Sequence, residues 1–372
     1  MEYTNTRRVF TDFFPPPKFL QMKSAGLDVS DRRIRFLYFK KGKKGLVIGR
    51  FGEMQIPEGI IVSGELKKPE ELRKVLRAFH EKYGIEFAHV SLPEERAYMV
   101  KMETPDISGD ELRNSIAFQL EDYVPIPVSE AVFDYSVIKK TEQRKGYVDV
   151  AVSVLPQNEL KKYVDMFTDT GIMPVSFEIE AQAIARAVLP RGDKGTYMVI
   201  DFGDTRMGIS IVSGEAVRFT STINVGSDTI SLAIQKHFSI SPEEAYRMKN
   251  EKKISKSAGD KEFFQAVLST ISIIRDEINK LYIYWHTHGM EERGGGKIGK
   301  IVMCGGGANL AGLTDYLSAS LKIKVEIANP WCNVNSFENY IPEIPANEAL
   351  GYASVIGLAL ASASDTKDDT SV

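Results

Sequence analysis

The sequence contains few cysteines: only Cys304 and Cys332 occur in 372 residues, too far apart for a C-x-x-C pair. The chain therefore offers neither a disulfide framework nor a cysteine-based zinc site, which is typical of a reducing compartment. It also lacks an apolar run of the roughly 20 residues that a membrane-spanning helix requires. The longest run, from Gly351 to Ala363, is short and rich in Gly, Ala and Ser. Together these absences predict a cytoplasmic protein.

The N-terminal segment lacks the uninterrupted apolar core of a secretory signal. Arg7, Arg8 and Asp12 fall within it, and the prolines 15–17 follow. We expect residues 1–22 to form a flexible tail, with contact to a membrane surface as the less favoured alternative. The polar and acidic residues 362–372 are expected to form a disordered C-terminal tail.

The chain also has little net charge, with 47 Lys and Arg against 50 Asp and Glu, a formal charge of −3. Nucleic-acid binding needs a concentrated basic surface, so nucleic acid is not expected as a partner. A content of 43% apolar and 26% charged residues is ordinary for a soluble globular protein. Because 372 residues exceed one simple core, we expect two lobes.

Two similar hairpins open the two halves of the chain. In the first, the strand Ser24–Val29 leads through a polar turn into the strand Ile34–Phe39. In the second, the strand Tyr197–Phe202 leads through an acidic glycine turn into Met207–Val212, and Ala216–Thr222 follows. An internal duplication of this kind is more specific than either hairpin alone.

The remaining pattern predicts helices and strands around these hairpins. In the first half we expect a helix Pro69–Tyr83, ended by Gly84, and a strand Phe87–Leu92. A compact α+β insert follows. Its first helix begins at a capping box of Ser108 and Glu111 and turns Leu112, Ile116 and Leu120 inward. The other elements expected in the insert are the strands Tyr98–Met102, Val132–Ile138 and Val148–Leu155 and the helix Glu159–Thr170. In the second half we expect helices Ser227–Phe238, Pro242–Lys249, Lys261 to about His288, Leu310–Leu321 and Asn347–Ala361, and a strand Lys300–Met303.

Acidic and glycine residues follow three of these strands, where phosphate and metal are commonly held. Asp28 and Asp201 end the first strand of each hairpin, and carboxylates there hold Mg²⁺, usually through water. Gly305–Gly307 follow a third strand, where glycines let a nucleotide lie against the main chain. A single Asp in such a place is more often a turn former, but the three features together favour a clamp for a triphosphate.

The ordered set of these motifs resembles the signature of actin-like ATPases, to which the small-residue helix Glu348–Gly357 adds. The insert sequence 119–127, QLEDYVPIP, followed by Phe133-Asp134-Tyr135, resembles the PilM family of type IV pilus assembly proteins. Asn329-Pro330-Trp331 also resembles that family. The resemblance covers roughly residues 24–361.

The resemblance implies an α/β protein of the actin-like fold, with two duplicated ribonuclease H-like lobes around an ATP cleft and an inserted α+β subdomain, called 1C. The implied division is 23–95, 172–195 and 340–361 for subdomain 1A, 96–171 for 1C, 196–239 and 298–339 for 2A, and 240–297 for 2B.

The resemblance also implies a partner: the short cytoplasmic tail of a PilN-like bitopic membrane protein, docked in a groove between 1A and 1C. The protein would then lie at the cytoplasmic face of the inner membrane and link the membrane platform to the pilus motor ATPases. We assign the docking to Val124, Pro125, Ile126 and Pro127, with packing inside the insert as the alternative. Changing Ile126 to Glu is expected to abolish partner binding.

The resemblance further implies ATP and Mg²⁺ as ligands, with Mg²⁺ at Asp28 and Asp201. Glu180 resembles a carboxylate that orients water at the terminal phosphate, and a helix-start acid is the alternative. For Glu244, Arg247 and Lys249, the alternative is ordinary surface charge. The ATP-binding residues implied are Asp28, Ser30, Arg33, Asp201, Gly203, Asp204, Thr205, Glu244, Arg247, Lys249, Gly305, Gly306 and Gly307.

Both phosphate turns depart from the actin-like pattern. The first has Ser30 and Arg32-Arg33 in place of Gly and small residues, and the second has Thr205-Arg206-Met207. Bulky residues hinder close approach of the main chain to phosphate, although Arg33 and Arg206 offer direct phosphate contacts. We therefore expect binding to survive with feeble hydrolysis.

Three other functions remain open. An FtsA-like division protein is disfavoured because the chain ends in a polar sequence rather than an amphipathic helix. A sugar kinase is disfavoured because no catalytic Asp in a sugar pocket is found. The third is a nucleotide-free scaffold of the same fold. It stays possible because both phosphate turns depart from the actin-like pattern.

Overall fold

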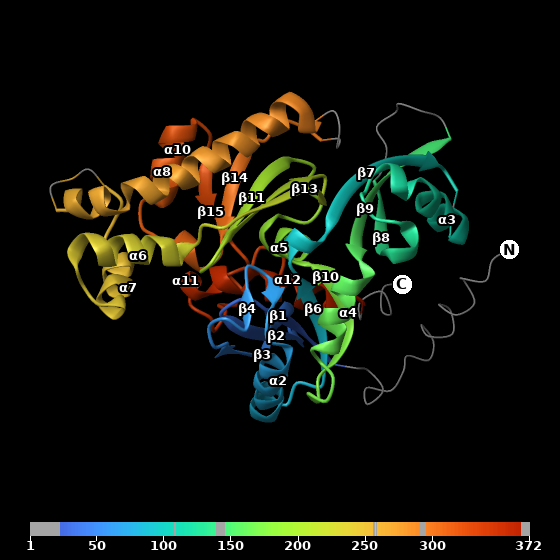
Figure 1. Ribbon diagram of the computed structural model, residues 1–372, viewed down its shortest axis with the longest axis horizontal. Coiled ribbons are helices and arrows are strands. Elements are labelled where there is room, and N and C mark those ends of the chain that lie inside the picture. Colours follow the sequence, from blue (N-terminus) through green and yellow to red (C-terminus); the bar gives the residue numbers. More distant parts are fainter. Residues whose placement is uncertain are drawn as a thin grey trace.

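The computed structural model describes residues 23–107, 109–138, 146–255, 257, 259–290 and 295–365, and it consists of two lobes with a smaller body attached at one side (Figure 1). The expected tails at 1–22 and beyond 365, and the capping residue Ser108, lie outside the described residues. The last helix continues to Asp365, so residues 362–365 are helical and not part of a disordered tail as predicted. No helix of the described part is both long and apolar enough to cross a membrane.

The first lobe is built on a five-stranded sheet in the order β10-β6-β1-β2-β3. Helix α2 packs on one face through Leu72, Leu76 and Phe79. Helices α5 and α12 cover the other face, where the missing side chain of Gly26 lets α12 approach β1 closely. The elements are β1 (Ser24–Val29), β2 (Arg33–Gly42), β3 (Gly45–Gln55), α2 (Pro69–Tyr83), β6 (Phe87–Leu92), β10 (Met173–Ile179), α5 (Glu180–Val188) and α12 (Ala353–Asp365), with the short pair β4 (Ile61–Val62) and β5 (Glu65–Leu66) and the turn η1 (Glu94–Arg96).

The second lobe repeats this plan with the order β13-β12-β11-β14-β15. In each sheet the first strand pairs antiparallel with the returning strand and parallel with a later strand, so the predicted duplication is confirmed. The strands are β11 (Thr196–Phe202), β12 (Met207–Ser213), β13 (Ala216–Ile223), β14 (Lys300–Cys304) and β15 (Val325–Ile327).

Several helices of the second half of the chain depart from the predicted bounds. The long helix α8 ends at Tyr284 and continues as one π-helical turn, η4 (Trp285–Gly289). Helix α10 begins at Leu313, not at Leu310, because Gly312 adopts a left-handed conformation with φ 82° directly before it. The elements are α6 (Ser227–Phe238), α7 (Pro242–Glu251), α8 (Lys261–Tyr284), η5 (Gly306–Asn309), α10 (Leu313–Leu321), α11 (Ala346–Ala349) and η6 (Leu350–Tyr352).

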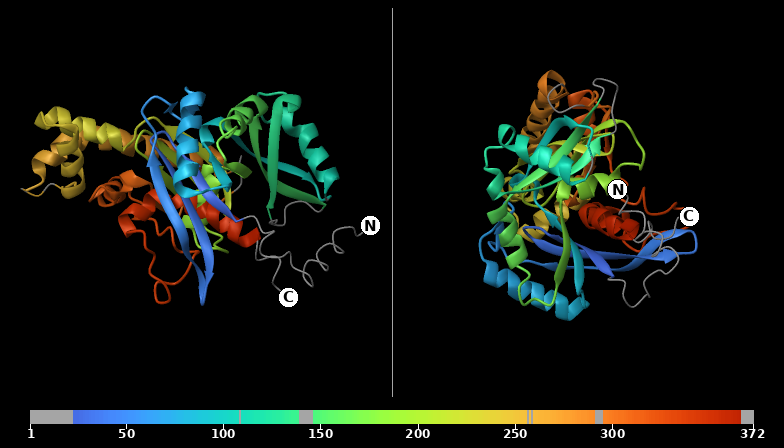
Figure 2. Two further views of the ribbon diagram at one scale, coloured as in Figure 1. Left: turned by 90° about the horizontal axis from the view of Figure 1, so that it is seen from below. Right: turned by 90° about the vertical axis from the view of Figure 1, so that its right-hand side faces the viewer.

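The predicted insert forms the smaller body, which lies at one side of the two lobes, with β7 and β9 against β13 of the second lobe (Figures 1 and 2). Its three-stranded sheet has the order β7-β9-β8, and helix α3 packs on it through Leu112 and Ile116. Helix α4 differs from the expectation, because its buried Tyr163 belongs to the core of the first lobe. The elements are β7 (Tyr98–Pro105), α3 (Asp110–Gln119), η2 (Leu120–Asp122), η3 (Val128–Glu130), β8 (Ala131–Ile138), β9 (Tyr147–Pro156) and α4 (Gln157–Asp165).

Candidate functional site

A cavity of about 630 Å³ lies between the lobes, and both hairpin turns and the glycine loop line it. This volume suits a small-molecule or cofactor ligand. The structure therefore brings together most of the residues that the sequence singled out. Those lining the cavity are Asp28, Ser30, Arg33, Glu180, Asp201, Gly203, Asp204, Thr205, Lys249, Gly305 and Gly306.

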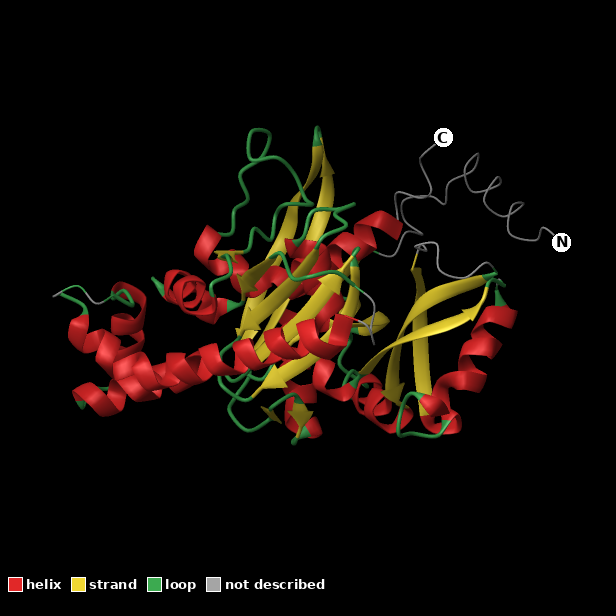
Figure 3. Ribbon diagram, turned by 90° about the horizontal axis from the view of Figure 1, so that it is seen from above, coloured by secondary structure: helices red, strands yellow, loops and turns green. Residues whose placement is uncertain are grey.

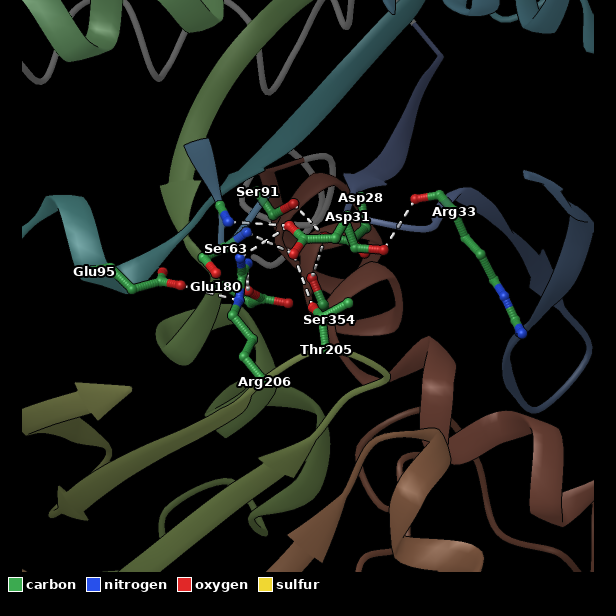
Figure 4. Close-up of polar contacts among 12 residues, drawn as sticks. Asp28, Asp31, Arg33, Ser63, Ser91, Glu95, Glu180, Thr205, Arg206 and Ser354 are labelled. Carbon is green, nitrogen blue, oxygen red and sulfur yellow. Dashed lines mark hydrogen bonds and ion pairs between the residues drawn. The ribbon is translucent and has the colours of Figure 1, made fainter. Parts of the chain in front are cut away.

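Asp28 and Asp201 face this cavity from equivalent strands of the two lobes. Asp28 is buried, its pKa is raised by burial, and the hydroxyls of Ser91 and Ser354 donate to its Oδ1 (Figure 4). Burial and the charge of Asp28 raise the pKa of Asp201 to about 6. The two carboxylates thus repel each other across the cleft, an arrangement that a bound cation relieves.

Two glutamates add to this negative potential. Glu180 is the first residue of α5, and burial followed by the charges of Asp28 and Glu94 raises its pKa well above the usual range. Glu94 lies in η1, and burial together with the charge of Glu95 raises its pKa to about 7. Sequence reasoning missed Glu94, because it stands on an irregular turn that no motif marks.

The described residues contain no group of three or more His, Cys, Asp or Glu placed to hold a metal ion. The protein would therefore supply only one or two carboxylates to Mg²⁺, which normally keeps several waters and takes phosphate oxygens as further ligands. Asp28 and Asp201 fit that role.

Arg206 crosses the cleft instead of facing it freely (Figure 4). Its guanidinium lies 3.1 Å from Asp31, 3.0 Å from Glu95 and 4.0 Å from Glu180, all on the first lobe. The hydroxyl of Thr205 also donates to Asp31, at 2.8 Å. Thr205 and Arg206, which depart from the actin-like pattern, therefore join the two turns. The expected contact of Arg206 with phosphate would have to compete with these three carboxylates.

Most other cations of the cleft are also paired. Arg32 contacts Glu58 and Asp228, Arg35 contacts Glu53, and Arg33 lies at 3.8 and 3.9 Å from Glu53 and Asp204.

Lys249 differs from these arginines. Its ammonium donates to the hydroxyls of Ser227 and Ser231, at 2.8 and 2.9 Å, and within the described part of the chain no carboxylate lies at ion-pair distance from it. Burial lowers its pKa. Lys249 is therefore the cation most available to an anionic ligand.

The main chain of the glycine loop comes close to neighbouring residues, as its glycine content predicted. Gly305 has φ 81°, and a side chain there would lie 2.4 Å from Asp201 Oδ1. Gly306 lines the cavity, whereas Gly307 packs against the ring of Phe202 and does not.

The sequence correctly placed helix α7 at the cavity, but two of the three residues predicted on it do not line the cavity. Glu244 forms a capping box with Ser241, and neither it nor Arg247 lines the cavity. Tyr246 and Asn250 do, together with Lys249. Their spacing of three and four residues marks one helix face, a signal that was available in the sequence.

Comparison with known proteins agrees with this geometry. The family model of the type IV pilus assembly protein PilM matches residues 26–363. The chain belongs to the PilM family.

Solved structures show the same fold. One component of a PilM-PilN type IV pilus biogenesis complex is 16% identical with a TM-score of 0.73, covering 92% of this chain and 99% of that one. MreB5 of Spiroplasma citri bound to ADP is 13% identical with a TM-score of 0.56, covering 92% and 97%. The actin-like fold is therefore confirmed, and the family match favours pilus assembly over the FtsA-like and kinase alternatives.

The docking residues assigned from the PilM resemblance lie apart from the groove between the insert and the first lobe. Val124 is buried in the insert's own core, and Ile126 packs partly against that core. Pro125 and Pro127 are exposed. None of the four lines the groove, which favours the packing alternative.

The groove itself has a volume of about 730 Å³. One wall comes from β8 and β9 of the insert, and the rest from β10 and α5 of the first lobe and from β11, β12 and β13 of the second lobe. Both β8 and β10 are edge strands, with one side of each open in the sheet order. Exposed edges with apolar neighbours suit an extended peptide.

Proposed function

We propose that the protein is an ATP-binding component of type IV pilus assembly that grips the cytoplasmic tail of a PilN-like membrane protein. The observation that carries this proposal is the pairing of two sites on one fold: an acidic interlobe cleft between duplicated hairpins, and an open-edged groove beside the insert. The tail would hold the protein at the cytoplasmic face of the inner membrane, between the membrane platform and the motor ATPases.

ATP with Mg²⁺ fits the cleft by charge and shape. Bound Mg²⁺ neutralises phosphate charge, and Asp28 and Asp201 would hold it, partly through water. Gly203 and Gly305 let phosphates and ribose approach the main chain, as their places in the cleft lining allow. Lys249 supplies a cation without a competing carboxylate.

Hydrolysis should be slow. Water activation at a terminal phosphate needs an ionised carboxylate or a well-placed acceptor. Arg206, which lies 4.0 Å from Glu180, is shared with Asp31 and Glu95, so it is not free to orient Glu180 or a water at the terminal phosphate. Binding would therefore set the closure of the lobes without rapid turnover.

Nucleotide titration by calorimetry tests the cleft. We expect ATP to bind in the presence of Mg²⁺ and more weakly in EDTA. No heat with ATP or ADP under either condition would overturn nucleotide binding and leave the nucleotide-free scaffold.

The partner groove is tested with a PilN tail peptide. Val132 lies on β8, is 37% exposed and lines the groove, so Val132→Glu should reduce peptide affinity at least tenfold without unfolding the protein. Phe118 on α3 is 90% exposed but lies outside the groove lining, so Phe118→Glu is the matched control and should bind normally. Equal binding by both variants would exclude the groove. Ile126→Glu is expected to disturb the packing of the insert, because Ile126 packs against its core, and circular dichroism measures this.

A further inference from the structure

A lysine-rich hairpin tip stands beside the partner groove. The tip that joins β2 and β3 carries Lys40, Lys41, Lys43 and Lys44, all exposed. Within the described residues, none of the four lies in an ion pair with a carboxylate, and only Lys44 has a polar contact, to Asn339 Oδ1 at 3.2 Å. The tip therefore concentrates four exposed positive charges in a chain whose formal charge is −3.

Two exposed apolar side chains lie on the loop that packs against this tip. The loop is bound to the edge of β3, where Asn335 donates to the carbonyl of Leu46 and the amide of Ile48 donates to the hydroxyl of Tyr340. Phe337 is 55% exposed and Ile341 is 80% exposed. The hairpin (blue) and this loop (red) project together from the body in the left view of Figure 2, and Figure 3 shows the same projection from the opposite side.

The tip is continuous with the partner groove. Leu46, two residues after Lys44, lines the groove, as does Asn333, two residues before Asn335. A tail that leaves a bilayer and enters this groove would bring the lysines and the apolar pair to the bilayer surface. This orientation rests on the proposed function.

We propose that the β2–β3 tip and the loop 335–341 form a direct contact with anionic lipid headgroups. Lysine ammonium groups are attracted to an anionic leaflet, and exposed Phe and Ile side chains enter its interfacial region. An acidic protein partner would also attract the lysines, but it would not account for the two exposed apolar side chains next to a membrane-tethered tail. Glu338 and Glu343 lie on the same loop, and the hydroxyl of Tyr340 donates to Glu343. The four lysines outnumber these two acids.

Vesicle co-sedimentation of the full chain tests this contact, with phosphatidylcholine vesicles alone or containing about a third phosphatidylglycerol. Each lysine near an anionic surface contributes a similar attraction, so changing all four tip lysines to Gln should lower partitioning to the anionic vesicles at least about tenfold. A matched control replaces Lys74, Lys161, Lys236 and Lys252 by Gln, which are exposed lysines on or beside helices α2, α4, α6 and α7. The control should partition like the wild type, and binding should weaken with added salt.

Equal partitioning of the tip variant and the wild type would overturn the proposal, as would equal losses in the tip and control variants. A tip variant that keeps vesicle binding but loses capture by an acidic polypeptide would also overturn it, in favour of a protein partner. Binding of the PilN tail peptide is measured on the same proteins without lipid. A tip variant that still binds the peptide separates failure of the lipid contact from failure of the proposed function.

Discussion

Asp31 and Arg206 stand on opposite lobes, and their side chains meet at 3.1 Å, where Asp31 also accepts the hydroxyl of Thr205 and the amides of Ser63 and Gly64. Asp31 is buried, so this contact is shielded from solvent. It joins the two phosphate turns directly. The turns therefore have a contact of their own that holds the lobes together.

Asp31→Ala is expected to lower the free energy of unfolding by roughly 3 kcal/mol, because it leaves a largely buried guanidinium and two amides short of a partner. Glu58→Ala is the comparison. Glu58 pairs with Arg32 but is exposed, so its loss should cost less than about 1 kcal/mol. Denaturant titration measures the free energy of unfolding of both variants. Equal losses would show that the buried Asp31 contact stabilises the protein no more than the exposed Glu58 pair.

Asp28→Asn and Asp201→Asn are expected to remove most of the Mg²⁺ dependence of ATP binding. Each takes away one of two carboxylates that repel each other and would hold the ion. Affinity in EDTA should stay equal or rise, because less negative charge faces the phosphates. Calorimetry with and without Mg²⁺ measures this. The exposed Asp315 lies outside the cleft, and Asp315→Asn should leave both affinities unchanged.

Glu94 predicts a pH dependence of stability. Burial, then the charge of Glu95, raises its pKa from 4.5 to about 7, so between these values the folded protein holds a proton that the unfolded chain has released. The free energy of unfolding should therefore fall as the pH rises through this window, by at most about 3 kcal/mol. Glu94→Gln cannot ionise, and its stability should fall less between pH 5 and 7. An unchanged slope in the variant would assign the dependence to other groups.

Lys249→Met is expected to separate binding from stability. The variant removes the unpaired cation of the cleft, and ATP affinity should drop about tenfold or more. The free energy of unfolding should stay within about 1 kcal/mol, because burial of Lys249 opposes its charge, as the lowered pKa shows. Arg247→Met is the control on the same helix, outside the cavity lining, and should bind ATP normally. Equal losses in the two variants would remove Lys249 from the nucleotide site.

The hairpins and their converging acids could be predicted because they depend on local chemistry. An apolar strand that ends in Asp and turns back is visible within one window of sequence, and the duplication doubled the signal. The two edge strands of the first lobe, β3 and β10, were not predicted, whereas the edge strands β7, β8 and β13 were. β3 contains three glycines and alternates buried with exposed residues, and β10 contains Pro174 with exposed Met173 and Val175. Each of these two strands pairs on one side only, so few of its residues show the buried apolar pattern by which a strand is predicted.

Contacts between distant segments account for the other misses. Arg206 was expected at the phosphates, but its carboxylate partners Asp31 and Glu95 lie more than a hundred residues away, as does Glu94, which the sequence did not place on the cleft. Val124 was assigned to the docking surface as an apolar residue of the PilM-like motif, yet it lies in the core of the insert. The sequence window shows a residue's neighbours along the chain and not the layer that covers it.

Helix α5 contributes residues to both the interlobe cleft and the partner groove. Glu180 at its start lines the interlobe cleft, and Gln182, Ala185 and Arg186 line the partner groove. An α-helix rises about 1.5 Å per residue, so the two sets lie within roughly one and a half turns of a stiff rod. If filling one site displaces that rod, the other site must change its shape as well. Thermodynamic reciprocity then makes the two ligands alter each other's affinity by the same factor, whichever arrives first.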